Sequence, residues 1–350
     1  MADTFNYRID HHGSLIRPAF LTAARERAAA GEIDAETLHR AETEAVEEAV
    51  DYQRRLRSTV VTDGDFPRED FRSAVFDAVS GFRRTGQDAD GLPRWVAEAL
   101  PKAHGPLLAD WAARLAGLTV IAPKASLPSP AYLAATTFDP ELIAAGGPAT
   151  ARELGEALAE IIRAEIELLV SRGVRLIQLN NPLLLGQVAA EPTPGGALSF
   201  EDTLAVEALA VPLDGRGQGV RIGVSPGWAA PAAVDRARAE RLYGQVPADR
   251  WVLPYDQGTD AELDLLKALP EDRDVCLGVV DATVPAREDI DTVMARIDLG
   301  AEIKDIEDMA VAPSRGFADS AGRPLLSAEE QRRKLVLVET LARYCWGNEF

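Results

Sequence analysis

Cysteine and histidine are both rare in this chain. Its 350 residues include two cysteines and four histidines, which are Cys276, Cys345, His11, His12, His39 and His104. Two cysteines far apart in the sequence cannot build a disulfide scaffold, and they fit a reducing cytoplasm. Because zinc sites in proteins draw mainly on His and Cys, the scarcity of both also limits metal chemistry.

Basic residues and long apolar segments are lacking as well. Lys and Arg total 37 against 56 Asp and Glu, which gives a formal net charge of −19. This balance argues against a nucleic-acid backbone or an anionic membrane as the main partner, although a local group of arginines can still hold a small anion. No apolar run is long enough to span a membrane, and the first ten residues do not resemble a signal peptide. We expect a cytoplasmic protein whose partner is a small molecule.

The chain does contain a repeated alternation of apolar strands and helices. The clearest strand is 174–182, VRLIQLNNP, a nearly continuous apolar run that ends in two amides and a proline. Seven further strands are predicted at 7–9, 58–62, 118–122, 219–224, 251–253, 275–280 and 306–311. Helices are predicted between most of them, among others at 34–57, 150–171, 231–243 and 327–344. Eight strands that alternate with helices over this length favour a closed (β/α)₈ barrel over an open doubly wound sheet.

We expect one domain over residues 1–350, with an excursion at 72–117 between the second and third strands. Within it, 83–94 is rich in turn residues, and 95–100 (WVAEAL) and 108–117 are predicted to be helical. Residues 123–133 contain three prolines and are predicted to form an extended loop after the third strand.

Polar side chains follow most of the predicted strands, where a barrel enzyme holds its substrate. Asn180 and Asn181 end the central strand, and buried amides need hydrogen-bond partners. Asp63, Asp65 and Arg68 follow the second strand and form either a ligand clamp or an internal ion pair.

The later strands end in further candidate residues. Tyr255, Asp256 and Asp281 follow the sixth and seventh strands. With Asp65, these two acids are the candidate catalytic acids or bases. Trp228 can either stack on a flat ring of a ligand or pack over the barrel. Cys276 lies inside a strand and is expected to be inert core.

Six motifs in order along the chain suggest a family. They are HHGSLIRP at 11–18, VTDGDFPREDF at 61–71, LPSPAYL at 127–133, LIQLNNP at 176–182, SRGF at 314–317 and KLVLVETLARYCWG at 334–347. Together they resemble the catalytic domain of cobalamin-independent methionine synthase, particularly its short single-domain bacterial relatives. The resemblance covers nearly the whole chain. It implies a (β/α)₈ barrel that moves a methyl group from methyltetrahydrofolate to a thiol held as thiolate on zinc.

The sequence departs from that family at the zinc site. The places that the resemblance assigns to zinc ligands hold Gly223, Ser225, Pro254 and Arg315, and none of these supplies the expected ligand. We therefore expect no zinc there. A different metal site that uses His11 or His12 with Asp63 and Asp65 is chemically allowed, but hydrogen bonding by these histidines is favoured.

Other family positions have also changed. The resemblance implies two acids at the end of the fourth strand, one of which meets the amino group of homocysteine, and here they are Asn180 and Asn181. The acid after the second strand is the shorter Asp65, and Thr283 lies nearest to the place of the family's general-acid histidine. Homocysteine is therefore not the expected acceptor.

The resemblance and the residues together give a set of candidate substrate contacts. Arg315 is expected either to hold an anionic group of the substrate or to pair with Asp256 or Asp281. The full set is His12, Ser14, Arg17, Arg68, Asn180, Asn181, Trp228, Tyr255 and Arg315.

These features predict a methyl or other alkyl transferase without the family zinc, for which methyltetrahydrofolate is a candidate donor. Two alternatives remain open. One is a metal-independent lyase or hydrolase on the same barrel, of which uroporphyrinogen decarboxylase is a distant example. The other is a non-catalytic protein that binds a small molecule. Polar groups after most strands favour an enzyme over a pure binder.

Overall fold

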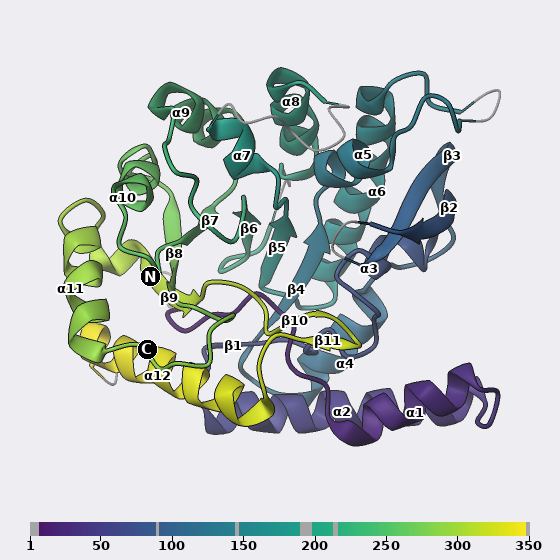
Figure 1. The fold of residues 1–350 in the computed structure, drawn as a ribbon, viewed down its shortest axis with the longest axis horizontal. Coiled ribbons are helices and arrows are strands. Elements are labelled where there is room, and N and C mark those ends of the chain that lie inside the picture. The colour runs from purple at the N-terminus through teal and green to yellow at the C-terminus, as the bar shows by residue number, and fades with distance from the viewer. Residues whose placement is uncertain (1–6, 89–90, 144–146, 190–197, 213–215, 348–350) are drawn as a thin grey trace.

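The centre of the computed structural model is a curled, parallel sheet (Figure 1). The structure describes residues 7–88, 91–143, 147–189, 198–212 and 216–347. Seven strands lie in the order β1-β4-β5-β6-β7-β8-β9. They are β1 Val60–Val61, β4 Ala122–Pro128, β5 Leu176–Asn180, β6 Arg221–Ser225, β7 Arg250–Pro254, β8 Asp274–Val280 and β9 Met309–Pro313.

The segment around Ile9 occupies the eighth position of this sheet. Ile9 forms a parallel bridge with Val311 of β9. On its other side, the backbone N–H of Thr59 donates to the carbonyl oxygen of Ile9 at 3.3 Å, next to β1. The start of the described chain therefore connects the two outer strands, and the predicted barrel architecture is confirmed.

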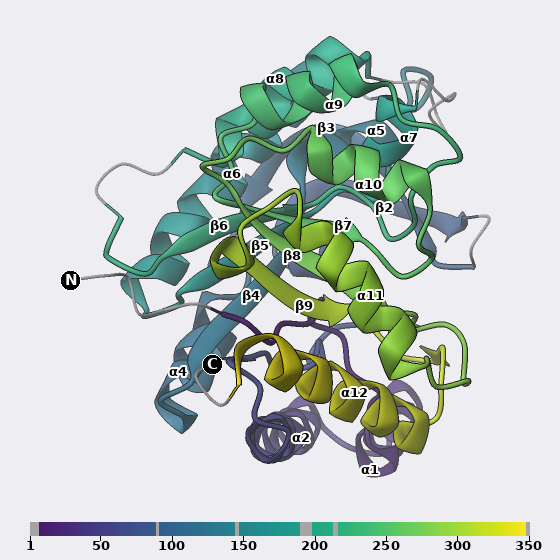
Figure 2. The ribbon, with the colours of Figure 1, turned by 90° about the vertical axis from the view of Figure 1, so that its left-hand side faces the viewer.

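Twelve α-helices surround or flank the sheet within the described residues. They are α1 Ala19–Ala29, α2 Ala35–Arg55, α3 Ser73–Phe76, α4 Ala109–Leu118, α5 Pro130–Thr137, α6 Ala151–Ser171, α7 Leu184–Val188, α8 Phe200–Ala210, α9 Arg236–Gln245, α10 Asp260–Lys267, α11 Ile290–Ala301 and α12 Ala328–Trp346. Figures 1 and 2 show α1, α2 and α12 together on one side of the barrel, where their apolar residues form one cluster.

Local sequence signals explain several helix starts. Asp34 caps α2 by accepting from the backbone N–H of Thr37. Ser327 and Glu330 form a capping box at the start of α12. Ser129 caps α5, and Pro130 occupies its first turn, where a missing N–H costs nothing.

Two short antiparallel sheets extend the barrel. The region expected to be an excursion forms a hairpin of β2 Val79–Gln87 and β3 Pro93–Ala103. After β9, the strands β10 Ala318–Ser320 and β11 Arg323–Pro324 form a smaller pair. Strands β10 and β11 line a cavity at the open end of the barrel, and the turn between β2 and β3 reaches the same cavity through Leu92.

Three predicted elements differ in the structure. The third strand is not 118–122 but β4, and Val120 is fully exposed. The prolines of 123–133 are compatible with this strand because Pro123 needs only its carbonyl oxygen, which accepts from the N–H of Arg175 at 3.2 Å. Residues 95–100 lie in β3 rather than in a helix, since Trp95 stacks on Phe76 with ring centroids 4.7 Å apart.

Two further boundaries moved by a few residues. The helix predicted from Pro231 begins at Arg236, after the N-cap Asp235. The last strand begins at Met309 because residues Ile306–Asp308 form a 3₁₀ turn. Among the described residues, no helix combines the length and apolarity that a membrane span requires.

Candidate functional site

Two neighbouring cavities open at the carboxyl ends of the parallel strands. The first cavity has a volume of about 260 Å³, and seven of the predicted residues line it: His12, Ser14, Arg17, Asp65, Asn180, Trp228 and Arg315. The second cavity measures about 790 Å³ and is lined by Asp256 and Asp281. Trp228 and Arg315 line both cavities and so form the wall between them.

The turn after Ile9 supplies one side of the first cavity. Ser126 of β4 donates to the carbonyl oxygen of His12 at 3.0 Å, which fixes the turn on the sheet. Ser14 donates to the carbonyl oxygen of Ala318 at 2.9 Å and thereby holds β10 over the cavity. Arg17 donates through Nη2 to the carbonyl oxygens of Asp65 and Arg68 at 2.8 and 2.7 Å.

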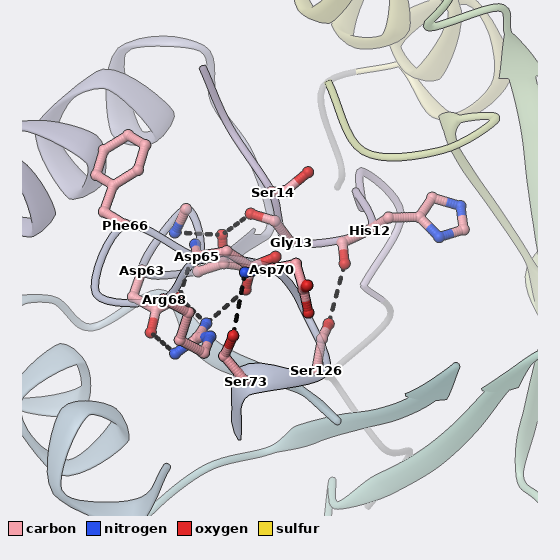
Figure 3. A network of polar contacts seen from close by, with 12 residues as sticks. His12, Gly13, Ser14, Asp63, Asp65, Phe66, Arg68, Asp70, Ser73 and Ser126 are labelled. Atoms are coloured by element: carbon pink, nitrogen blue, oxygen red, sulfur yellow. Dashed lines mark hydrogen bonds and ion pairs between the residues drawn. The ribbon is translucent and has the colours of Figure 1, made fainter. Parts of the chain in front are cut away.

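The two adjacent histidines have different surroundings. His11 Nε2 lies 2.7 Å from Gln53 Oε1, inside the protein. His12 lines the first cavity, and its ring points away from the Asp63, Asp65 and Arg68 group (Figure 3). Burial, followed by the positive charge of Lys124, lowers the pKa of His12 to about 3. His12 is therefore neutral near pH 7.

Asp63, Asp65 and Arg68 form the internal ion pair that the sequence left as one of two options (Figure 3). Arg68 donates to both oxygens of Asp63 at 2.9 and 2.7 Å and also to Asp65. Arg68 lines neither cavity, so the structure does not place it as a ligand contact. Asp65 does face the first cavity, with a left-handed backbone φ of 58°. Burial raises the pKa of the Asp65 carboxyl despite its pairing with Arg68.

The same loop contributes an acid that sequence reasoning did not single out. Asp70 is buried and lines the first cavity. Arg72 binds both oxygens of Asp70 and reaches Asp88, beside the turn of the β2–β3 hairpin, at 3.2 Å. The density of acids in residues 63–70 was a signal for Asp70, but its partner Arg72 lies beyond that cluster.

Asn180 and Asn181 at the end of β5 point to different places. Asn180 lines the first cavity, and its Oδ1 accepts from Gln178 Nε2 at 2.7 Å. Asn181 lines neither cavity. Its Nδ2 donates to Glu207 of α8, and its Oδ1 accepts from the N–H of Leu183. The expected ligand contact by Asn181 is not what the geometry shows, because adjacent strand residues face opposite sides of a sheet.

Glu207 is a buried acid that the sequence did not reveal. Its Oε1 accepts from Ser129 Oγ at 2.6 Å and from Asn181, while its Oε2 has no partner. Burial raises the pKa of this carboxyl to about 7. In the sequence, Glu207 is only an acid within an otherwise apolar helix. That pattern does not show which residues bind its carboxylate.

The wall between the cavities is a stacked pair. The guanidinium carbon of Arg315 lies 4.3 Å from the ring centroid of Trp228. Trp228 in turn meets Phe71 edge-on, with centroids 6.3 Å apart. Arg315 forms an ion pair with Asp319, an acid that the sequence analysis did not name beside the two alternatives of a substrate anion and of Asp256 or Asp281.

The acids of the second cavity are close enough to influence each other. Burial, followed by the negative charge of Asp281, raises the pKa of Asp256 to about 6. Asp281 accepts from the backbone N–H of Thr283 at 2.7 Å. Tyr255 lines neither cavity, because its hydroxyl turns to the helix layer and donates to the carbonyl oxygen of Arg296 at 2.9 Å. The expected ligand contact by Tyr255 is therefore not supported.

Known proteins resemble this chain over its full length. The uncharacterized proteins YxjH and YxjG of Bacillus subtilis (strain 168) are 26% and 24% identical to it, and each alignment covers 97% of this chain and 95% of the relative. A protein from Listeria monocytogenes, described provisionally as a vitamin-B12-independent methionine synthase, superposes with a TM-score of 0.76 at 22% identity and 98% coverage of both chains. A B12-independent methionine synthase from Shewanella sp. W3-18-1, in complex with selenomethionine, gives 0.73 at 16% identity and 97% coverage of both. No family model matches the sequence. These solved structures share the fold of this chain.

The side chains present do not fit a zinc ion of the expected type. Ser225 ends β6 with its hydroxyl buried and without a partner, and Pro254 ends β7. Cys276 is buried inside β8, where burial raises its thiol pKa to about 12, and Cys345 lies in α12. Within the described residues, no three His, Cys, Asp or Glu side chains come together in a way that could hold a metal ion.

Proposed function

We propose that this chain is an alkyl transferase of the cobalamin-independent methionine synthase type that works without zinc. The observation that carries the proposal is the pair of cavities that share Trp228 and Arg315. A transferase needs two substrates whose reacting atoms meet, and two compartments with a common wall provide that arrangement. The full-length likeness to methionine-synthase-like structures supports the same reaction class.

The two cavities suit substrates of different size. The first cavity has about a third of the volume of the second, so it suits the smaller of the two substrates, the acceptor. The second cavity is about three times larger and borders the indole of Trp228. An extended donor with a flat ring fits this cavity better, and methyltetrahydrofolate is the candidate donor.

The proposed chemistry is a nucleophilic displacement. A nucleophile of the acceptor attacks the methyl carbon, the bond from that carbon to the donor nitrogen breaks, and the nitrogen takes up a proton. Asp256 is the candidate acid for that proton because its pKa of about 6 leaves a protonated fraction near neutral pH. Asp281 favours that protonated form through its charge. Asp65 is the candidate base for the acceptor, since it faces the first cavity.

The acceptor is proposed to be a small anionic compound other than homocysteine. The Shewanella protein binds selenomethionine, an amino acid, in its structure. In this chain, Asn180 and Asn181 place amides where the family resemblance leads one to expect acids, and both amides already bond within the protein. Arg17 and Arg315 line the first cavity, and their positive charges favour an anionic acceptor. A free thiol with an ordinary pKa of about 8.5 is only a few per cent thiolate at neutral pH, so an acceptor thiol needs a base in a metal-free site.

The decisive experiment supplies methyltetrahydrofolate with a panel of small anionic acceptors and follows tetrahydrofolate by mass spectrometry. The expected result is turnover with at least one acceptor, unchanged by a chelator, and absent or very slow turnover with homocysteine. Fast, chelator-sensitive methylation of homocysteine would contradict the proposal. A panel without any turnover would also count against it.

A metal-independent lyase or hydrolase is the second candidate. The Asp256–Asp281 pair favours it, because an acid with a pKa of about 6 can serve as a general base for water. This alternative predicts bond cleavage of a single substrate in the second cavity, with no need for a donor. Loss of that cleavage in Asp256→Asn, with the first cavity still able to bind its ligands, would distinguish it from the transferase.

A further inference from the structure

His12 carries a buried polar atom that no protein group satisfies. The residue is only 7% exposed and lines the first cavity. Its Nε2 has no hydrogen-bond partner in the structure. Because buried polar atoms are normally hydrogen-bonded, an unpartnered nitrogen at a cavity wall indicates that a ligand supplies the partner.

Two neighbouring amides determine which ring nitrogen of His12 carries the proton. Gln178 Nε2 donates to Asn180 Oδ1 at 2.7 Å, and the same Nε2 lies 3.3 Å from His12 Nδ1. An amide nitrogen can only donate, so Nδ1 of His12 must accept. In a neutral imidazole the other nitrogen then carries the hydrogen, so Nε2–H is an unused donor on a ring that lines the cavity.

The surroundings keep this ring neutral. Burial and the positive charges of Lys124 and Arg315 disfavour the imidazolium, while Asp10 opposes them only in part. His12 therefore offers one fixed N–H rather than a proton that it exchanges with the ligand. His12 therefore acts as a hydrogen-bond donor, and no protein atom accepts from its Nε2.

Arg17 presents a second donor to the same cavity. It is 8% exposed, and its Nη2 donates to two backbone carbonyls, those of Asp65 and Arg68. Its Nε is buried and has no partner. A guanidinium cannot accept a hydrogen bond, so whatever completes its bonding must be an acceptor. Two buried donor groups at one cavity call for an acceptor-rich ligand.

We propose that His12 Nε2–H and Arg17 together bind an oxyanion of the small substrate, a carboxylate in the first instance, and that Gln178, held by Asn180, is a positioning residue that fixes the tautomer of His12. This assignment deepens the proposed function, on which it rests only for calling the ligand the acceptor substrate. Asn180 then also contributes indirectly to ligand binding, because its side chain holds Gln178 in place.

The first test reads the tautomer and needs no variant. Nitrogen-15 NMR of the histidine side chains should show the hydrogen of His12 on Nε2 in the ligand-free protein. Calorimetric titration should show that 3-mercaptopropanoate and related thiol acids bind at least tenfold more tightly than their uncharged amides. Equal binding of acids and amides, or a hydrogen on Nδ1, would overturn the proposal.

Gln178→Glu is the sharpest variant. A carboxylate next to Nδ1 accepts a hydrogen bond, so it should move the hydrogen of His12 from Nε2 to Nδ1 and turn Nε2 into an acceptor that repels an anion. The expected result is this change in the NMR spectrum together with a loss of at least tenfold in acid binding. Gln187→Glu is the matched control, because Gln187 is also buried but contacts Thr203 in the helix layer.

The outcomes of these titrations separate the two proposals, since no methyl donor is present. If Gln178→Glu moves the hydrogen and acids still bind as in the parent protein, the His12 assignment is wrong. Arg17→Met should weaken acid binding at least tenfold without a change in the His12 tautomer, and unchanged binding would remove Arg17 from the site. Acid binding as expected without any methyl transfer would refute the proposed function and leave this inference standing.

Discussion

Arg315 stands between two substrates in the proposed reaction, and its planar side chain is held on two sides. Trp228 covers one face of the guanidinium, and Asp319 pairs with its edge. Such a fixed fork can bind an oxyanion through two parallel hydrogen bonds, which a lysine cannot reproduce.

We therefore expect Arg315→Lys to weaken acceptor binding clearly and Arg315→Ala to weaken it more, by about 10- to 100-fold, as for the loss of a charge-assisted hydrogen bond. Calorimetric titration measures both. Arg236→Ala is the control, because it removes an i,i+4 ion pair on exposed α9. If Arg315→Ala melts much lower but its folded fraction binds normally, Arg315 is a structural residue and not an anion anchor.

Glu207 predicts a pH dependence of stability. Its folded pKa of about 7 lies above the ordinary value of a glutamate, so the folded state keeps a proton that the unfolded chain has lost. Between the ordinary glutamate pKa and about pH 7, the free energy of unfolding therefore falls as pH rises. Glu207 contributes about 1.4 kcal/mol per pH unit to this fall. Glu207→Gln should remove that part of the slope.

Urea denaturation of the parent protein and of Glu207→Gln at pH 5 to 8 measures the difference. The variant should gain stability relative to the parent as pH rises through this range. Glu44→Gln, at an exposed position of α2, is the control and should leave the slope unchanged. Parallel curves for the parent protein and Glu207→Gln would show that Glu207 is ionised in both states.

At the residue scale, sequence patterns located the strand ends better than the direction of each side chain. Asn180 and Asn181 were both expected at the ligand, but neighbouring residues of a strand face opposite sides, and only Asn180 lines a cavity. The ligand contact predicted for Tyr255 is not seen for a similar reason, since its hydroxyl donates to the carbonyl oxygen of Arg296 in the helix layer. The acid-rich stretch 63–70 indicated Asp70 only as one acid among several, and the partners of Glu207, Ser129 and Asn181, are distant in the sequence.

At the scale of elements, the close packing of α6 against α8 rests on Gly155. A Cβ at this position would lie 2.9 Å from Val206 and 3.3 Å from the Cβ of Ala134 in α5. Both contacts are tighter than normal packing allows, so the helices could not keep their separation. Gly117 in α4 has nothing within 4 Å of the same added atom.

The two glycines therefore make a matched pair. Gly117→Ala should raise the free energy of unfolding by roughly 0.5–1 kcal/mol, since alanine favours a helix more than glycine does. Gly155→Ala should instead lower it by about 1–3 kcal/mol through overpacking. Urea denaturation of both variants tests the pair, and an equal gain in both would mean that α6 and α8 can move apart freely.

Elements with strong periodicity and capping signals were predicted within a few residues, whereas elements stabilised by distant contacts were not. Helices α2, α6 and α12 carry their own apolar stripes and caps. Residues 95–100 have helix-forming composition but lie in β3, because pairing with β2 and stacking on Phe76 outweigh local preference. The sequence places the third strand too early, because its prolines normally indicate a loop.

At the scale of the whole molecule, the distribution of potential ligands predicts how the protein treats metal ions. The open end of the barrel offers serine, proline, glycine and arginine at the four places where the resemblance implies zinc ligands. Protein purified with its native metal content should contain much less than one zinc per chain by elemental analysis. One zinc per chain that survives mild chelation would contradict this prediction and would require a different set of ligands.

The bridge between Ile9 and Val311 also constrains when the barrel can close during synthesis. The ribosome makes residues near the start of the chain first, at about 5–20 residues per second, so Ile9 waits tens of seconds for its partner strand. Until β9 emerges, the edges of the growing sheet present unpaired N–H and C=O groups. Nascent chains that stall or end before residue 311 therefore carry an open sheet, and they should be substrates for chaperones or proteases rather than partly active enzymes.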